Sequence, residues 1–209
     1  MTVYIPCYFN SIKEREENFY KNLNQFLNLG YKVVLYWMND FKCSIENDNL
    51  TIINTKKTKI IEIRNVILNT FYSTDDDYCI FSDDDIFLKS EIKERFDCIC
   101  FKNDYNKGLT ETFKISASLM LLRNFRKAYN IIPFFDESLL AAEGIDFGMT
   151  LNELGIKTYR KSTDDIIVFK GQSSIFENPL KKVYELTQDY KYLYNKHAKR
   201  NKKNIRDTE

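Results

Sequence analysis

The stretch Tyr78-Cys79-Ile80-Phe81-Ser82-Asp83-Asp84-Asp85 carries the strongest sign of the fold. Its apolar residues form a short run bounded by polar segments, which is typical of a buried strand. Three adjacent carboxylates follow that strand directly. In open α/β sheets, ligands bind outside the carboxyl ends of the strands. The three aspartates are therefore candidate site residues if the rest of the chain builds such a sheet.

The residues before this stretch alternate between strand and helix patterns. Apolar runs predict strands, whereas capping residues and three- or four-residue apolar spacing predict helices. In chain order we expect a strand at 3–5, a helix from the capping box Ser11-x-x-Glu14 to Gly30, strands at 32–38 and 50–53, and a helix capped by Thr58. This order predicts a mostly parallel sheet flanked by helices, in the α/β class.

The residues after the acidic stretch continue the same class. We expect a strand at 114–123, a helix at 145–154 ended by Gly155, a strand at 166–169 and a long helix from Asn178-Pro179. The spacing predicts that five residues of the long helix face inward, namely Leu180, Val183, Leu186, Tyr190 and Tyr194. The chain is then one domain at 1–178 followed by a C-terminal helix and a basic, frayed tail at 179–209.

Composition excludes several classes of protein. Among 209 residues, 44% are hydrophobic, which is too many for a disordered chain. The net charge is +1, so a charged partner has to be met by a local patch. The five cysteines include no C-x-x-C pair, which favours a reducing cytoplasm. We expect no secretory leader and no membrane span, since Thr2-Val3-Tyr4-Ile5 lacks a basic leader and no apolar run reaches about 18 residues.

The three aspartates suit a divalent cation. On an extended segment, side chains at i and i+2 point the same way, so Asp83 and Asp85 can share a site while Asp84 faces elsewhere. Mg²⁺ or Mn²⁺ prefers such oxygen ligands and keeps positions open for water or phosphate. A solvated acidic turn, such as Asp75-Asp76-Asp77 nearby, is the alternative.

At these residues the chain resembles nucleotide-sugar glycosyltransferases of the GT-A fold, some of which are phage enzymes. The helix with Ile63-Arg64-Asn65 followed by the D-x-D strand end is similar to the first half of that family, as is the stretch from Val3 to Asn10. Phe135-Asp136-Glu137, the stretch Ala142 to Gly148, and Leu154-Gly155 are similar to its "F-D-E … G-E-D-x-D-F … L … G" segment. The matching motifs lie between residue 3 and about residue 175.

The resemblance implies roles for individual residues. Asp83 would lie near the ribose or the metal, and Asp85 would coordinate a Mn²⁺ or Mg²⁺ ion that bridges the diphosphate of a donor, such as a UDP-hexose. Arg64 would stabilise the departing diphosphate, unless it is an exposed arginine paired with Glu62 or Asp75. The remaining donor-binding positions would be Pro6, Tyr8, Asn39, Asp40, Asp84 and Lys170. Tyr8 has core packing as its alternative.

Two positions depart from the family pattern. The acid–base candidates are Glu143 and Asp146, because an acceptor hydroxyl needs a carboxylate to take its proton. Many inverting members have Glu-Asp where this chain has Glu143-Gly144, so either Glu143 or Asp146 takes the role or the enzyme is retaining. For Asp146 the alternative is a helix-start residue. The family's histidine ligand is also missing after the last strand, where Lys170 could contact phosphate instead; His197 is expected to be a solvated tail residue.

The basic tail offers the only indication of an acceptor. Seven lysines and arginines and no acid lie between Lys191 and Arg206, and we take Lys196, Lys199 and Arg200 as acceptor-binding candidates. The acceptor would be hydroxymethylated DNA or a saccharide; a solubilising helix is the alternative. A Lys-, Asn- and Ile-rich composition suits a phage or AT-rich bacterial source. The rival functions are a phosphotransferase of the haloacid-dehalogenase type, with a nucleophilic aspartate, and a non-catalytic nucleic-acid-binding module.

Overall fold

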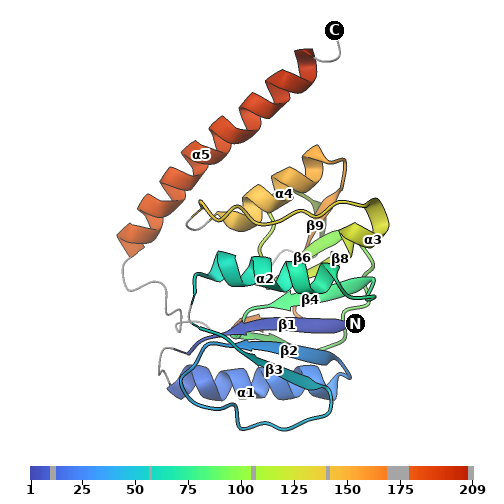
Figure 1. Ribbon diagram of the computed structural model, residues 1–209, viewed down its shortest axis with the longest axis vertical. Helices are drawn as coiled ribbons and strands as arrows, with labels where there is room; N and C mark the ends of the chain where they lie inside the picture. The colour runs from blue at the N-terminus through green and yellow to red at the C-terminus, as the bar shows by residue number, and fades with distance from the viewer. Residues whose placement is uncertain (10–12, 57, 105–106, 140–141, 169–178, 207–209) are drawn as a thin grey trace.

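The computed structural model describes residues 1–209 except 10–12, 57, 105–106, 140–141, 169–178 and 207–209 (Figure 1). Its centre is an eight-stranded sheet in the order β3-β2-β1-β4-β8-β6-β9-β7. The strands are β1 (Thr2–Cys7), β2 (Lys32–Trp37), β3 (Leu50–Asn54), β4 (Tyr78–Ser82), β6 (Cys98–Lys102), β7 (Gly108–Glu111), β8 (Leu119–Arg123) and β9 (Thr158–Ser162). The strands β5 (Ile86–Leu88) and β10 (Ile166–Val168) form a separate antiparallel ribbon.

The first half of the sheet is parallel. Strand β1 pairs with β2 on one side and with β4 on the other, and β2 pairs with β3. The chain therefore winds outward from β1 through β2 to β3 and then returns to the other side of β1. In doubly wound sheets, ligands bind outside the carboxyl ends of the strands at such a reversal, which here lies between β1 and β4.

The second half adds two strands of opposite direction. Strand β8 is antiparallel to both β4 and β6, and β7 is antiparallel to β9 at the sheet edge. Strands β6 and β9 run parallel, in the same direction as β4. Six strands of this sheet thus share one direction, which confirms the predicted α/β class with a mostly parallel sheet flanked by helices.

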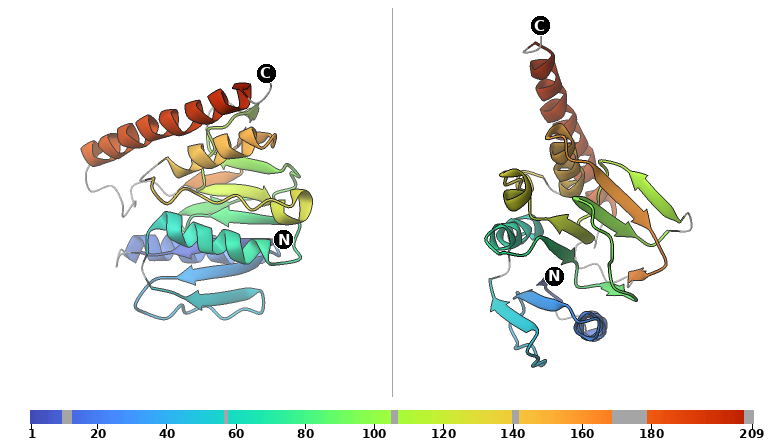
Figure 2. Two further views of the ribbon diagram at one scale, coloured as in Figure 1. Left: turned by 45° about the horizontal axis from the view of Figure 1, so that its top comes forward. Right: turned by 90° about the vertical axis from the view of Figure 1, so that its right-hand side faces the viewer.

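Helices cover both faces of the sheet (Figures 1 and 2). One face packs on α1 (Lys13–Asn28), through Phe19, Leu23 and Phe26, and on the β5–β10 ribbon. The other face packs on α2 (Ile60–Tyr72), α3 (Phe125–Tyr129), α4 (Glu143–Glu153) and α5 (Pro179–Arg206). Strand β1 alternates between the two clusters, with Tyr4 on the α2 side and Ile5 on the α1 side, as a strand buried on both faces must.

Several local predictions were wrong. The apolar run predicted as one strand at 114–123 forms a strand only from Leu119, because the 113–117 backbone packs against α4. Four strands, β5, β6, β7 and β9, were missed; β5 has three residues and β7 is fully exposed, so neither shows a strong pattern. Thr58 is not the cap of α2, since Lys59 occupies that position and Thr58 Oγ1 donates to Glu62. Ser11 lies outside the described residues.

The inward face of α5 agrees with the prediction only in part, since Leu186 packs against the core but other positions differ. Tyr190 and Tyr194 are 50% and 76% exposed, whereas Asp189, Leu193 and His197 are buried. The side chains at 180–184 lie outside the described part, so Leu180 and Val183 are not placed. The apolar pattern did not predict Asp189 and His197 on the inner face, because the partners of these polar residues come from elsewhere in the chain. Within the described residues, no helix has the length and hydrophobicity needed to cross a membrane.

Candidate functional site

The three aspartates form the turn between β4 and β5, at the carboxyl end of β4. The Asp83 N–H donates to Ser118 O at 2.7 Å, which fixes the turn against the chain before β8. Asp84 is buried, whereas Asp83 and Asp85 are partly exposed. The middle carboxylate is therefore the most buried of the three.

Arg64 links this turn to two helices. It lies on α2 with its side chain 6% exposed, and its Nη2 donates to Asp83 Oδ1 at 2.8 Å. Its Nη1 donates to Oε1 of Glu143, the first residue of α4. Burial opposes the charge, but the two carboxylates outweigh it and raise the pKa of Arg64 above its ordinary value. The alternative of an exposed arginine is therefore wrong.

Asp84 braces the fold instead of lining the site. Its side chain is 3% exposed, and its Oδ1 accepts from Arg15 Nη2 of α1 at 2.7 Å. Its Oδ2 accepts from the Tyr8 N–H at 3.2 Å. Burial raises the pKa of Asp84 to about 7, and the Arg15 guanidinium opposes this rise. The prediction that Asp84 binds a donor is therefore wrong, because its side chain is buried and paired with Arg15.

The loop after β1 is held by Asn39. The Asn39 carboxamide accepts from the Phe9 N–H at 2.8 Å and donates to Cys7 O at 3.3 Å. Pro6 is buried within β1 and Tyr8 packs partly against the α2 face, whereas Asp40 is exposed. Asn39 thus shapes a predicted donor loop through its backbone, and Tyr8 has the packing role that was its alternative.

Asp83 and Asp85 are the two carboxylates that the sequence predicts to hold a divalent cation. Burial and the charge of Asp83 raise the pKa of Asp85, so an added cation would relieve the local excess of negative charge. Two carboxylates suit Mn²⁺ or Mg²⁺ when phosphate and water complete the shell. Among the described residues, no group of three His, Cys, Asp or Glu side chains is arranged to hold a metal by itself.

Asp146 is a partner of α5. It is 1% exposed, and Lys196 Nζ contacts both its oxygens at 2.7 and 2.9 Å. His197 Nε2 lies 2.9 Å from Asp146 Oδ1, and its Nδ1 lies 2.5 Å from Glu153 Oε1. Asp146 therefore has a structural role and not the role of a base. His197 is buried at 3% exposure, so the prediction of a solvated tail residue is wrong.

The basic tail contributes inward contacts in its described part. Lys196, predicted to bind an acceptor, also donates to Asp136 Oδ2 at 2.8 Å, and its side chain is 16% exposed. These contacts make it a docking residue between α4 and α5. Lys199 and Arg200 lie on α5, but their side chains are outside the described part, as is Lys170.

Gly144 has a packing reason to lack a side chain. A Cβ at this position would lie 2.6 Å from Ile115 O, and one at Gly148 would lie 2.1 Å from Phe113 O. Helix α4 therefore touches the 113–115 backbone directly along its glycine face. An acidic residue at position 144 would not fit, which leaves Glu143 as the site carboxylate on this helix.

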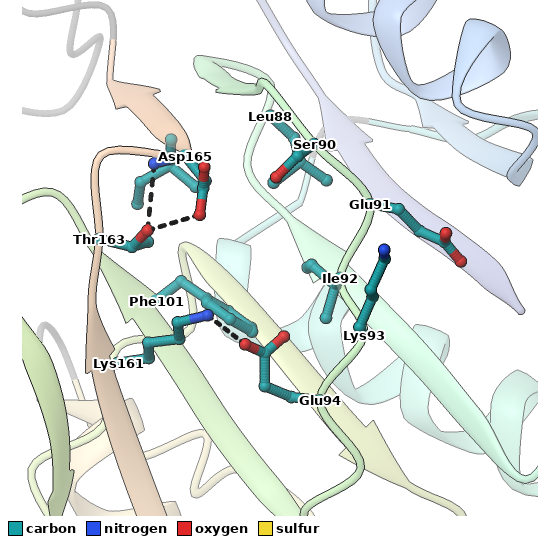
Figure 3. A pocket seen from close by; sticks show the side chains of 11 residues that line it. Leu88, Ser90, Glu91, Ile92, Lys93, Glu94, Phe101, Lys161, Thr163 and Asp165 are labelled. Carbon is teal, nitrogen blue, oxygen red and sulfur yellow. Dashed lines mark hydrogen bonds and ion pairs between the residues drawn. The ribbon is translucent and has the colours of Figure 1, made fainter.

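A separate cavity of about 300 Å³ lies at the far end of β5 from the acidic turn (Figure 3). Phe101 and Ile92 line it together with two polar pairs. Lys161 pairs with Glu94, and Thr163 Oγ1 donates to Asp165 Oδ2 at 2.8 Å. The cavity is thus distinct from the cluster of Arg64, Asp83 and Glu143.

Two site contacts escaped sequence reasoning. Arg15 pairs with Asp84 across 69 residues, and Asp189 of α5 accepts from the Ala142 N–H at 2.8 Å across 47. No local sequence motif indicates that Arg15 or Asp189 makes such a contact. Asn65, named in the motif, brackets Phe135: its carboxamide accepts from that residue's N–H and donates to its carbonyl, each at 2.9 Å.

No protein-family model and no curated protein sequence matches this chain. Among solved structures, A197 from STIV is similar at 13% identity and a TM-score of 0.48, over 85% of this chain and 98% of that one. A mannosyltransferase from Pyrobaculum calidifontis, in complex with GDP-Man and Mn²⁺, is similar at 13% identity and a TM-score of 0.49. That match covers 78% of this chain and 54% of the mannosyltransferase. Likenesses of this size carry no argument about function.

Proposed function

We propose that this chain is a metal-assisted glycosyltransferase that uses a nucleotide-sugar donor. One observation carries the proposal: Arg64 joins Asp83, at the carboxyl end of β4, to Glu143 at the start of α4. Asp83 lies at the carboxyl end of the strand where the sheet reverses its winding, the place at which doubly wound α/β proteins bind their ligands. The buried guanidinium could stabilise the negative charge of a leaving diphosphate. The Glu143 carboxylate could accept the proton of an acceptor hydroxyl.

The donor side would be formed by the acidic turn and the loop after β1. Asp83 and Asp85 would hold a Mn²⁺ or Mg²⁺ ion, which when bound stabilises the negative charge on the diphosphate. Arg64 keeps its positive charge there because two carboxylates face it. Tyr8, whose N–H is anchored on Asp84, sits in the loop proposed to meet the base and ribose.

Glu143 is the proposed base. The bond between the anomeric carbon and the diphosphate oxygen breaks, and a bond forms between that carbon and the acceptor oxygen. The acceptor proton passes to Glu143, and the nucleoside diphosphate leaves. Arg64 engages Glu143 Oε1, and we assign the proton to Oε2. The side chain is 15% exposed, which is compatible with contact to a bound acceptor.

The acceptor is proposed to carry a hydroxyl group, on hydroxymethylated DNA or on a saccharide. Lys196 is engaged in ion pairs, so the remaining candidates on the tail are Lys199 and Arg200. A gel-based assay with radiolabelled UDP-glucose distinguishes the two classes. Transfer to hydroxymethylcytosine DNA but not to unmodified DNA would support the first class, and transfer only to oligosaccharides would support the second.

Isothermal titration with UDP and with GDP, each with and without Mn²⁺, tests the donor site. Metal-dependent binding that Asp85→Asn abolishes supports the proposal. The matched control is Asp77→Asn, which removes a 75% exposed carboxylate from the neighbouring acidic turn and should change nothing. Binding without metal would assign the cation's role to Arg64. Absence of binding to either nucleotide, together with a phosphoenzyme on Asp83, would replace this proposal with a phosphotransferase.

A further inference from the structure

Helix α5 packs along α4 through polar contacts. In two views α5 lies beside α4 at the edge of the molecule (Figures 1 and 2). The inner side of α5 buries Asp189, Leu193 and His197 at 3% exposure each. Two of these three residues are polar, and each of the two bonds to a residue of α4 or of its N-cap. The helix is therefore docked at specific points instead of by a general apolar face.

The first docking point is the start of α4. Asp189 Oδ2 accepts from the backbone N–H of Ala142, its N-cap residue, at 2.8 Å. An alanine has no side chain with which to satisfy the free N–H groups of a helix start. A carboxylate at this end also interacts favourably with the helix dipole. Asp189 thus supplies, from another helix, an acceptor that the side chain of Ala142 cannot provide.

The second docking point lies one turn further along α4. Lys196 holds both oxygens of Asp146 and also reaches Asp136, which lies before the helix. Hydrogen bonds and charge from its two partners raise the pKa of Lys196, although burial opposes this rise. Together the two points fix where α4 begins and how it is rotated about its axis.

We propose that Asp189 is a positioning residue for Glu143, so that α5 is a working part of the site. Glu143 directly follows the residue that Asp189 holds, and it pairs with Arg64, which holds Asp83 at 2.8 Å. A chain of contacts then runs from α5 through α4 and α2 to the acidic turn. The expected effect on donor binding rests on the proposed function. The structural coupling between Asp189 and Glu143 rests on these contacts alone.

The link is tested by a double-mutant cycle in urea unfolding, which needs no ligand. Asp189→Ala, Glu143→Gln and the double variant are compared with the wild type. If Asp189 positions Glu143, the shifts in urea midpoint of the single variants sum to more than the shift of the double variant. Additive shifts would overturn the proposal. If Asp189→Ala does not fold, Asp189→Glu, which displaces the carboxylate by one methylene, takes its place in the cycle.

Two further variants separate positioning from mere structure. Asp189→Asn keeps an oxygen that can accept from the Ala142 N–H, and Tyr190→Ala removes a half-exposed neighbour on the same helix. We expect Asp189→Ala to weaken Mn²⁺-dependent binding of UDP or GDP more than tenfold at a temperature where it is folded. Asp189→Asn and Tyr190→Ala should stay within about threefold of the wild type, and Asp189→Ala should add nothing in a Glu143→Gln background.

The outcomes distinguish the two proposals. A wild type that binds neither nucleotide contradicts the proposed function, while the urea cycle still decides the role of Asp189. If the wild type and the Asp189→Ala variant bind nucleotide equally well, the positioning role is overturned and the proposed function is left intact. Equal loss in Asp189→Ala and Asp189→Asn would likewise overturn it, since the hydrogen bond would then not be what matters.

Discussion

Arg64 Nη2 lies 2.8 Å from Asp83 Oδ1, between a helix and a strand end that are 19 residues apart in the chain. The same guanidinium reaches Glu143, a further 60 positions beyond Asp83 (143 − 83). One side chain thus ties together α2, α4 and the acidic turn. Since the pKa of Arg64 is raised above its ordinary value, the guanidinium keeps its positive charge at neutral pH and well above it.

Replacing Arg64 by Met should destabilise the protein by about 2–4 kcal/mol, because two partly buried carboxylates would lose their cation. Urea unfolding of the wild type and of Arg64→Met measures this loss in the free energy of unfolding. Adding Glu143→Gln should restore part of the loss. The control is Lys59→Met, which removes an ion pair of a 72% exposed lysine on the same helix start and should cost less than about 0.5 kcal/mol. Equal losses in the two single variants would contradict a buried role for Arg64.

Gly148→Ala should destabilise the fold by about 1–3 kcal/mol or more, although alanine is the better helix former by about 1 kcal/mol. The added Cβ would lie 2.1 Å from Phe113 O. Gly144→Ala, with its Cβ at 2.6 Å from Ile115 O, should cost less. Thermal unfolding ranks the two. Gly30→Asn serves as control, since nothing lies within 4 Å and asparagine accepts the left-handed backbone there. A stabilising Gly148→Ala would show that α4 does not pack this closely.

Acid should weaken the contact between α5 and the segment before α4. Burial favours the neutral form of Asp136, but hydrogen bonds from Lys196, Ser138 and Tyr192 outweigh this effect and hold the pKa of Asp136 well below its ordinary 3.8. A pKa that is lower in the folded protein than in the unfolded chain stabilises the fold at pH values above the pKa of the unfolded chain. This contribution is lost as the pH falls from there through the pKa of the folded protein. Asp136→Asn should therefore cost about 1–2 kcal/mol at pH 7, and the difference from the wild type should shrink below pH 4.

Urea unfolding between pH 7 and pH 2.5 measures this difference. Asp77→Asn, which removes the partner of Lys127 at the surface, is the control and should leave the urea midpoint almost unchanged at every pH. A difference for Asp136→Asn that stayed constant down to pH 2.5 would mean that its charge does not support the fold.

Asn22→Leu should stabilise the protein by about 1–2 kcal/mol. Asn22 is fully buried on α1, and neither its Oδ1 nor its Nδ2 has a hydrogen-bond partner within the described part of the chain. Leucine has the same branched shape without the cost of the unsatisfied amide. Asn24→Leu, at an exposed position on the same helix, isolates the smaller gain in helix propensity. If Asn22→Leu unfolds at lower temperature than the wild type, a partner for the amide has to be sought.

The sequence predicted the winding of the first half well. Strand periods, the helix period of α2 and the acidic end of β4 are local patterns, and the structure follows them closely. It predicted the start of α5 correctly but much of its inward face wrongly, because Asp189 and Lys196 occupy inward positions that an apolar rule assigns to Leu or Tyr. Burying a charged group is favourable only when a partner is present, and the partners Ala142 and Asp146 lie on another element.

The local residue pattern was enough to predict that a buried strand ends in three carboxylates and that helices alternate with strands around it. The pairing of each carboxylate with its cation, Asp83 with Arg64 and Asp84 with Arg15, depends instead on how the folded chain brings distant segments together. The tertiary structure also decided that Gly144 cannot carry a base, because the helix touches the Ile115 carbonyl. Periodicity is a property of neighbours along the chain, whereas ion pairs and close packing depend on residues that folding alone brings within a few ångströms.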